Sequence, residues 1–492
     1  MTETAKKKRG MPSSFTILLA LLAIVAVITV IVSGTSGGAV TAARLSDFCT
    51  APILGFADAL PVCLFVMILG GFLGMMTETG ALDNGIAVLV QKLKGNEIML
   101  IPVLMFIFSL GGTTYGMCEE TVPFYALLAA TMMAAGFDPM VGAATVLLGA
   151  GCGCLGSTVN PFAVGAAVDA LTGVDIAVNQ SIIIGLGAVL WIVTTAMSIV
   201  FVMSYAKKVK ADKGSTILSM QELKDAEEAH GKAASEVHKE VKLTGRQKGV
   251  LIAFAFTFVV MIVGFIPLAD LNEGVANFFD AGAVYDADGN AVVQGWSALI
   301  TGLPIGQWYF DEASTWFFLM AVLIGIIGGL SEKQIVNTFI TGAADMMSVV
   351  LVIALARGIS VLMANTGLDV YVLDAAANAL AGLSGVIFAP MSFLVYFGLS
   401  FLIPSTSGMA TVSMPIMGPL AVKLGFSPEV MVMIFSAAIG VVNLFTPTSG
   451  AIMGGLALAK IEWTTWLKFA LKLIVALSVV CAIILTVACV LI

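Results

Sequence analysis

Charged residues are scarce in this sequence of 492 residues. Asp, Glu, Lys and Arg together make up 11% of the chain, whereas soluble domains carry roughly 25%. Hydrophobic residues make up 59%, and the mean hydropathy is +1.04. Several apolar runs reach the ~20 residues that cross a bilayer as a helix. The composition therefore excludes an ordinary soluble domain and predicts an all-α polytopic membrane protein.

Residues and motifs that many enzymes and ATP-driven pumps use are also missing. The chain has two histidines, His230 and His238, and both lie in a polar stretch. It contains no HExxH metal motif and no Walker A phosphate loop. The seven cysteines lie mostly in apolar runs, where a free thiol packs as a small hydrophobe. We therefore expect neither an enzyme nor a resident cofactor.

The few Lys and Arg residues indicate the orientation. A basic cluster at residues 6–9 precedes an apolar run that is too long for a cleaved signal peptide. Segments rich in Lys and Arg stay in the cytoplasm, so we expect a cytoplasmic N-terminus. Residues 250–331 contain no Lys or Arg, and we expect their polar part, 267–313, to be extracytoplasmic. Within it, the acidic stretch 285–290 predicts a hairpin turn rather than a calcium loop.

These markers predict the following organisation. A cytoplasmic basic tail (1–14) precedes a first transmembrane repeat (15–205), a solvated cytoplasmic linker (206–248) and a second transmembrane repeat (249–492). Two re-entrant hairpins are expected at about 98–135 and 385–422. The predicted spans lie near 15–33, 59–79, 139–172, 181–204, 248–266, 314–330, 343–366, 428–460 and 467–491.

Two segments of the chain are diverged copies of one unit. The first contains residues 112–117 and 156–161, and the second contains residues 404–409 and 445–450, all rich in Gly, Pro, Ser and Thr. Such backbone survives at membrane depth only where it is buried or lines a wet cavity. Matching breaks in two halves point to a transporter's binding site. Because the copies enter from opposite sides, we predict inverted-topology repeats, each with a re-entrant hairpin and a broken transmembrane helix.

Small polar residues at these breaks are the candidate site. The N-terminal ends of half-helices attract anions and the carbonyl ends attract cations. Hydroxyl and amide groups there can bind a carboxylate or Na⁺, or can simply satisfy the interrupted backbone. Thr113, Asn160, Ser405 and Thr448 are the candidates for a coupling Na⁺. The full set is Thr113, Thr114, Tyr115, Gly116, Ser157, Thr158 and Asn160 in the first copy, and Ser405, Thr406, Ser407, Gly408, Asn443, Thr446, Thr448 and Ser449 in the second.

Three charged residues in apolar segments complete the candidate site. Glu119 and Glu120 follow the first hairpin tip, and the second copy has no acid there. An ionised side chain at this depth costs at least ~2.5 kcal/mol, so these acids need a partner. A cationic substrate group, a coupling H⁺ or Na⁺, and Arg357 are the alternatives. Arg357 can instead form a structural ion pair, for which we expect Asp345.

At these residues the chain resembles the C4-dicarboxylate anaerobic carrier family of the ion-transporter superfamily, in particular its YfcC-like branch. Segments 111–120, 156–162, 404–410 and 443–450 carry the resemblance. It implies a homodimer in the bacterial cytoplasmic membrane, in which each protomer has a scaffold and an elevator-type transport domain. Dicarboxylate carriers of the superfamily have Ser-Asn-Thr at both hairpin tips, whereas this chain has Thr-Thr-Tyr and Ser-Thr-Ser. The YfcC-like branch includes arginine/ornithine exchangers.

The leading hypothesis is a secondary transporter of amino acids that works by alternating access, with basic amino acids favoured. Glu119 and Glu120 would hold a guanidinium or ammonium group, and half-helix N-termini would hold the α-carboxylate. Arg357 would oppose such a substrate if it lined the same cavity. The alternative is a Na⁺- or H⁺-coupled importer of C4-dicarboxylates or other carboxylates, in which Arg357 binds the anion. The expected partners are a small-molecule substrate and the lipid bilayer, and no nucleic acid.

Overall fold

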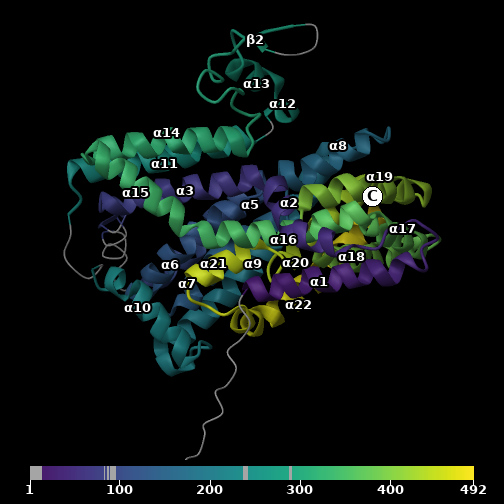
Figure 1. The fold of residues 1–492 in the computed structure, drawn as a ribbon, viewed down its shortest axis with the longest axis horizontal. Coiled ribbons are helices and arrows are strands. Elements are labelled where there is room, and N and C mark those ends of the chain that lie inside the picture. The colour runs from purple at the N-terminus through teal and green to yellow at the C-terminus, as the bar shows by residue number, and fades with distance from the viewer. Residues whose placement is uncertain are drawn as a thin grey trace, which may run out of the picture.

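The computed structural model describes residues 14–82, 84–85, 88, 96–236, 242–266, 268–286 and 291–492. Within this part the protein is helical, apart from one two-stranded antiparallel sheet (Figure 1). Some residues used for the sequence predictions lie outside the described ones. They are the basic cluster 6–9, His238 and residues 287–290 of the acidic stretch.

Nine helices in the described part are long and apolar enough to cross a membrane. Most of the predicted spans coincide with one of them, and the predicted hairpins each begin with one. These helices are α1 (Ser14–Ser33), α3 (Leu60–Glu78), α5 (Leu100–Tyr115, after the 3₁₀ turn η1, Glu97–Met99), α9 (Gln180–Ala211), α11 (Gly245–Phe265), α14 (Phe310–Gly328), α16 (Met347–Thr366), α18 (Gly385–Leu402) and α22 (Trp463–Leu491).

The two spans predicted to be broken are broken. Residues 139–172 form α7 (Pro139–Leu155), a π-helical turn η3 (Pro161–Gly165) and α8 (Ala166–Thr172). Residues 428–460 form α20 (Pro428–Val442) and α21 (Gly450–Leu458). The second arms of the hairpin segments are α6 (Val122–Ala134), after the 3₁₀ turn η2 (Glu119–Thr121), and α19 (Thr406–Lys423).

The structure adds helices that the sequence analysis did not predict. A helix of 14 residues precedes α3 and another precedes α16, so each of these two spans has a kinked extension. A further helix follows α16, and one lies in the linker between the two halves. These helices are α2 (Leu45–Asp58), α15 (Glu332–Asp345), α17 (Leu368–Leu380) and α10 (Met220–Glu236), the last preceded by the short turn η4 (Lys213–Ser215).

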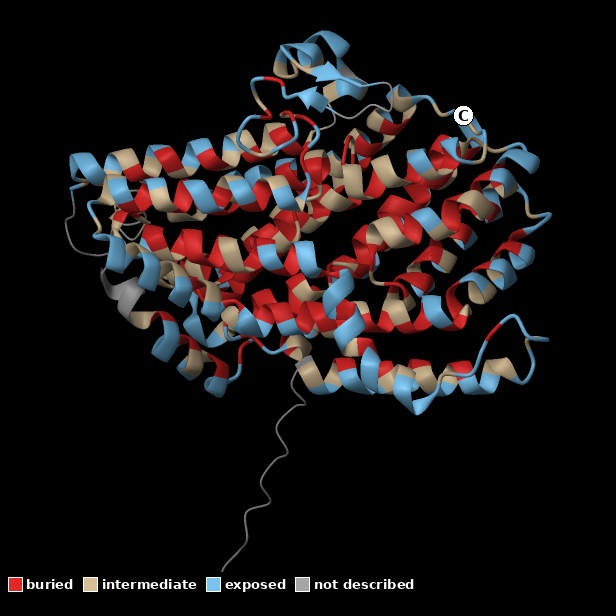
Figure 2. Ribbon diagram, turned by 45° about the horizontal axis from the view of Figure 1, so that its top comes forward, coloured by how far each residue is buried: buried red, intermediate tan, exposed pale blue. Residues whose placement is uncertain are grey.

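Helices α7 and α20 form the centre of the molecule. They contact each other, and almost every residue of both is buried (Figure 2). The hairpin helices α5 and α6 pack against α7, and α18 and α19 pack against α20. Helix α9 packs against α5 and α7, and α22 packs against α18 and α20. Contacts between α6 and α21 and between α8 and α19 join the two halves.

The outer helices carry apolar side chains on their exposed faces. On α22, Val475, Val479, Ile483 and Val487 recur every fourth residue and are each more than half exposed. A stripe of this kind lies on one face of a helix, and a large exposed apolar surface is unfavourable in water. These outward faces are therefore matched to lipid, as expected for a polytopic membrane protein.

Two small substructures lie outside the helical body. Residues 268–309 contain α12 (Leu268–Leu271), α13 (Glu273–Phe279) and the strands β1 (Val284–Tyr285) and β2 (Ala291–Val293), above α11 and α14 in Figure 1. The two strands pair antiparallel, which confirms the predicted hairpin. In the linker, α10 packs against α6 and also reaches the second half, because His230 Nε2 lies 3.1 Å from the Leu458 carbonyl oxygen.

Candidate functional site

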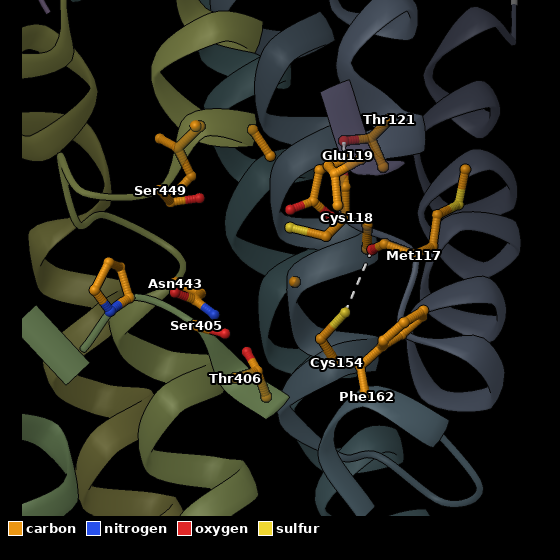
Figure 3. Close-up of a pocket in the computed structure, with 18 of the residues that line it drawn as sticks. Met117, Cys118, Glu119, Thr121, Cys154, Phe162, Ser405, Thr406, Asn443 and Ser449 are labelled. Atoms are coloured by element: carbon orange, nitrogen blue, oxygen red, sulfur yellow. Dashed lines mark hydrogen bonds between the residues drawn. The ribbon is translucent and has the colours of Figure 1, made fainter. Parts of the chain in front are cut away.

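A cavity of about 180 Å³ lies between the two halves, where the broken helices and hairpin tips meet. In Figure 3, side chains of the second half face Cys118, Glu119, Cys154 and Phe162 of the first. The predicted site residues that line the cavity are Gly116, Glu119, Glu120, Asn160, Arg357, Ser405, Thr406, Ser407, Asn443, Thr448 and Ser449. The remaining predicted residues do not line it: Thr113, Thr114, Tyr115, Ser157, Thr158, Gly408 and Thr446.

The hydroxyls of Thr113 and Thr158 join the first hairpin tip to the break after α7. Thr113 Oγ1 donates to the Gly156 carbonyl oxygen at 2.7 Å, and Thr158 Oγ1 donates to the Thr113 carbonyl oxygen at 3.0 Å. Both bonds satisfy backbone carbonyls that helix interruption leaves without partners. These two threonines therefore hold the cavity wall in place rather than face a ligand.

Other predicted residues of this group also have local partners. Thr114 Oγ1 donates to the Leu110 carbonyl oxygen at 2.6 Å, and Ser157 Oγ donates to the Cys154 carbonyl oxygen at 2.6 Å. The buried ring of Tyr115 stacks on Phe265, with 5.7 Å between ring centroids. In the second half, the hydroxyl oxygens of Thr446 and Thr448 lie 2.7 Å apart, and the Gly408 N–H donates to Ser405 Oγ at 3.1 Å.

Asn160 lines the cavity but uses its amide to start the next helical turn. Its Oδ1 accepts from the Phe162 N–H at 2.9 Å and the Ala163 N–H at 3.3 Å, and its Nδ2 donates to Ser157 Oγ at 3.0 Å. This is the N-cap arrangement that satisfies free N–H groups at a helix start. Of the four residues considered for Na⁺, Asn160, Ser405 and Thr448 line the cavity and Thr113 does not.

Glu119 and Glu120 lie at the beginning of the second hairpin arm, and both line the cavity. Glu120 is 2% exposed, and its Oε2 accepts the Cys118 N–H at 3.0 Å. The start of a helix favours a carboxylate because the N–H groups there carry partial positive charge. In the described part of the chain, neither carboxylate belongs to an ion pair.

Arg357 lines the cavity from α16, and its partner is not the residue expected from the sequence. Its Nε lies 2.9 Å from Oδ2 of Asp58, the last residue of α2. Asp345 ends α15 and lines a different cavity. Helix α2 was not predicted, so the sequence offered no reason to bring Asp58 to α16. The ion pair offsets the positive charge that Arg357 brings to the cavity.

Several polar groups of the second half remain available to a ligand. Within the described residues, the side chains of Thr406, Ser407, Asn443 and Ser449 form no hydrogen bond. Their counterparts in the first half, by contrast, are mostly bonded to one another and to backbone. The cavity therefore has carboxylates on the first-half side and free hydroxyl and amide groups on the second-half side.

Apart from Asn443, the residues of α7 and α20 that line the cavity were not predicted from the sequence. Two helical faces line it at the same spacing, one on α7 and one on α20. Residues separated by three, four and seven positions share a helix face, and the spacing within each aligned repeat was the available signal. The residues are Leu147, Ala150, Gly151 and Cys154 on α7, and Ser436, Ile439, Gly440 and Asn443 on α20.

A polytopic helical body with broken central helices around a polar cavity is typical of membrane transporters. The model of the C4-dicarboxylate anaerobic carrier family, DcuC, matches residues 39–490. The chain belongs to this family.

Two relatives in the curated proteins are similar over most of their length. An uncharacterized protein of Haemophilus influenzae is 28% identical over 445 residues, which cover 90% of this chain and 78% of the relative. The other relative, YfcC of Escherichia coli, is described as a "putative basic amino acid antiporter". It is 28% identical over 424 residues, which cover 84% of this chain and 74% of the relative.

Solved structures of two bacterial proteins match at lower similarity. One is MtrF of Neisseria gonorrhoeae, whose structure is reported as illuminating a class of antimetabolite efflux pumps. It aligns with a TM-score of 0.44 and 16% identity, and the alignment covers 98% of this chain and 96% of the MtrF chain. The YdaH transporter of Alcanivorax borkumensis aligns with a TM-score of 0.47 and 15% identity, covering 96% and 97%. Both are distant matches.

Proposed function

We propose that this protein is a secondary active transporter of amino acids, with basic amino acids as substrates of an exchange reaction. One observation carries the proposal: the central cavity holds two carboxylates that form no ion pair within the described part of the chain, while Arg357 is paired with Asp58. Glu119, Glu120 and Arg357 are the charged residues that line the cavity among those described. A guanidinium or ammonium group of the substrate would supply the missing positive charge through charge-assisted hydrogen bonds.

The opposite side of the cavity suits the α-carboxylate of the same substrate. Helix α19 begins there, and the leading N–H groups of a helix attract anions. Thr406 and Ser407 add hydroxyl donors that have no other partner among the described residues. The description of the Escherichia coli relative as a basic amino acid antiporter supports the same substrate class.

We further infer that the two halves are inverted repeats that support alternating access. Reciprocal contacts between α7 and α20 support this. A Cβ built on Gly151 would lie 2.3 Å from Leu444, and a Cβ built on Gly440 would lie 2.4 Å from Leu155. Gly151 and Gly440 are aligned in the two repeats, as are Leu155 and Leu444. A two-fold axis between the halves produces contacts of this kind.

The elevator movement and the homodimer implied by the family resemblance are part of the proposal. In it, α7, α20 and the hairpin helices carry the cavity, and α3, α11, α14 and α15 form the scaffold. The protein would reside in a bacterial cytoplasmic membrane with the N-terminus inside. Crosslinking of cysteine pairs, with one cysteine on α3 and one on α6, in the presence and absence of substrate tests the movement.

The alternative function is the coupled import of a C4-dicarboxylate, and Arg357 in the cavity wall is the observation that favours it. In this alternative Arg357 binds the anion, and Glu119 and Glu120 handle Na⁺ or H⁺. The ion pair with Asp58 argues against it, because Arg357 would have to leave an existing partner to bind the substrate.

Uptake into proteoliposomes separates the two functions. Vesicles loaded with ornithine and exposed to labelled arginine should exchange the two, and lysine but not succinate should compete. Glu119→Gln and Glu120→Gln each remove one charge, and losing a hydrogen bond to a charged group costs about 1.5–3 kcal/mol, or roughly 10- to 150-fold in affinity. Glu332→Gln, on the exposed start of α15, is the matched control. Wild-type affinity and rate in both cavity variants would contradict the proposal.

A further inference from the structure

Ser436 is a buried polar residue that the proposed binding groups do not include. It lies in the middle of α20 and is 1% exposed, and its hydroxyl oxygen has no hydrogen-bond partner in the described structure. A serine or threonine inside a helix commonly donates to the carbonyl oxygen four residues earlier. Thr145 does so in α7, at 2.7 Å from the Val141 carbonyl oxygen. Ser436 does not, although a buried hydroxyl without a partner costs about 1–3 kcal/mol.

Ser436 is also a residue that lines the central cavity. Its counterpart in the first repeat is Leu147, which lines the cavity from α7. The next aligned pairs are Ala150 with Ile439, Gly151 with Gly440 and Cys154 with Asn443. The wall formed by α7 thus carries leucine and thiol groups, whereas the wall formed by α20 carries hydroxyl and amide groups. The two walls therefore differ in polarity, although they come from aligned positions of the two repeats.

The two ends of the cavity are formed by different helices and turns. The turn that contains Glu119 and Glu120 contacts α21, whereas the π-helical turn η3 contacts α19 and α20. Figure 3 shows Ser449 across the cavity from Glu119 at one end, and Thr406 across from Phe162 at the other. Along α20, Ser436 lies two turns, about 10 Å, from Asn443, which ends the helix. Ser436 on α20 and the carboxylates of η2 line the same cavity, so one ligand in the cavity can contact both.

We propose that Ser436 is a specificity-determining residue whose hydroxyl donates a hydrogen bond to the α-carboxylate of an amino-acid substrate. This assignment rests on the proposed function, because it takes the cationic end of the same substrate to lie at Glu119 and Glu120. The first turn of α19 supplies further donors, since the leading N–H groups of a helix have no partner within it. Ser436 fixes which end of the substrate each half of the cavity holds.

The test compares two changes: the loss of the serine hydroxyl and the loss of the ligand carboxylate. Thermal unfolding of the purified full-length protein is measured with arginine and with agmatine, which is arginine without its carboxylate. Binding to the folded state raises the apparent stability by mass action, so the shifts report affinity. The variants are Ser436→Ala and Ser392→Ala. Ser392 is the matched control because it is equally buried, also lacks a hydrogen-bond partner and does not line the cavity.

In Ser436→Ala, we expect arginine to bind about 10-fold or more weakly, while the affinity for agmatine stays unchanged. The unliganded variant should be at least as stable as the wild type, because the change removes an unsatisfied buried hydroxyl. Ser392→Ala should leave both affinities unchanged. Equal weakening of arginine and agmatine, no weakening of either, or a marked loss of unliganded stability would each overturn the assignment.

The failure of the proposed function is distinguishable from a failure of this assignment. If arginine does not stabilise the wild type, the proposed function is wrong and the amino-acid part of the assignment fails with it. Thermal unfolding with succinate and with butyrate, which differ by one carboxylate, then tests whether Ser436 donates to a carboxylate independently of the amino-acid proposal. Weaker succinate binding in Ser436→Ala would keep Ser436 as a carboxylate donor, and unchanged succinate binding would remove it from the site.

Discussion

Replacing Gly116 with alanine is expected to loosen the first hairpin tip, because two separate costs arise there. Gly116 ends α5 with a left-handed backbone, at a φ of 79°, and an L-residue in that region costs about 1–2 kcal/mol. The added Cβ would also lie 2.5 Å from Asn160 Oδ1. Displacing Asn160 weakens a cap that accepts two N–H groups, a further loss of about 0.5–2 kcal/mol.

The sum of the two costs is roughly 1.5–4 kcal/mol. Thermal unfolding of the purified protein and its variants separates the backbone cost from the cost of displacing Asn160. Gly136→Ala is the control, since Gly136 has a φ of 86° but open space around its Cβ position. It should show the backbone cost alone. Combining Gly116→Ala with Asn160→Ala removes the colliding amide, so the double variant should lose less than the two single losses added together. Equal destabilisation by Gly116→Ala and Gly136→Ala would refute the contact with Asn160.

Three further predictions concern packing, a buried carboxylate and the linker. Gly440→Ala should destabilise the protein by about 1–3 kcal/mol in thermal unfolding, and more than Gly151→Ala, because the first Cβ meets backbone and the second meets a flexible leucine end. Tyr205→Phe should lower the free energy of unfolding by about 1–3 kcal/mol, because the phenol donates to Asp138 Oδ2 at 2.5 Å. An unchanged midpoint of thermal unfolding would contradict this prediction. Burial lowers the pKa of His230, so the neutral imidazole is the form that docks α10. The docking of α10 should be complete above about pH 6.5 and should weaken as the pH falls through the lowered pKa of His230. Limited proteolysis of the linker measures this, and cleavage should be faster at low pH. Equal cleavage rates at pH 7.5 and pH 5 would contradict the prediction.

The breaks in the helices were predictable because their signals are local. Glycine at 116 allows the left-handed end of α5, and Asn160 and Ser405 cap the helices that follow them. Each effect involves residues within one turn of each other in the chain, so the sequence pattern carries it. The kinked extensions α2 and α15 were not predicted, because their shorter, more polar sequences do not reach the length of a span.

The roles of single polar residues did not follow from the sequence. Thr113 and Ser405 occupy similar places in the two copies, yet Thr113 is bonded to the neighbouring break, and Ser405 lines the cavity. Arg357 pairs with Asp58, about 300 residues earlier in the chain. Such pairings depend on which helices cross, and the crossing of α2 and α16 is a long-range contact that no local pattern encodes.

By itself the sequence determined the class of the protein, its family and the positions of its interrupted helices, because hydrophobic length, charge placement and helix-breaking residues act locally along the chain. Only the tertiary structure decided which polar groups satisfy one another and which remain open to a ligand. The hydrogen-bonding capacity of a side chain is used up by whichever partner the fold brings within reach. For Thr158 that partner is backbone, and for Ser436 the part of the chain that the structure describes supplies none.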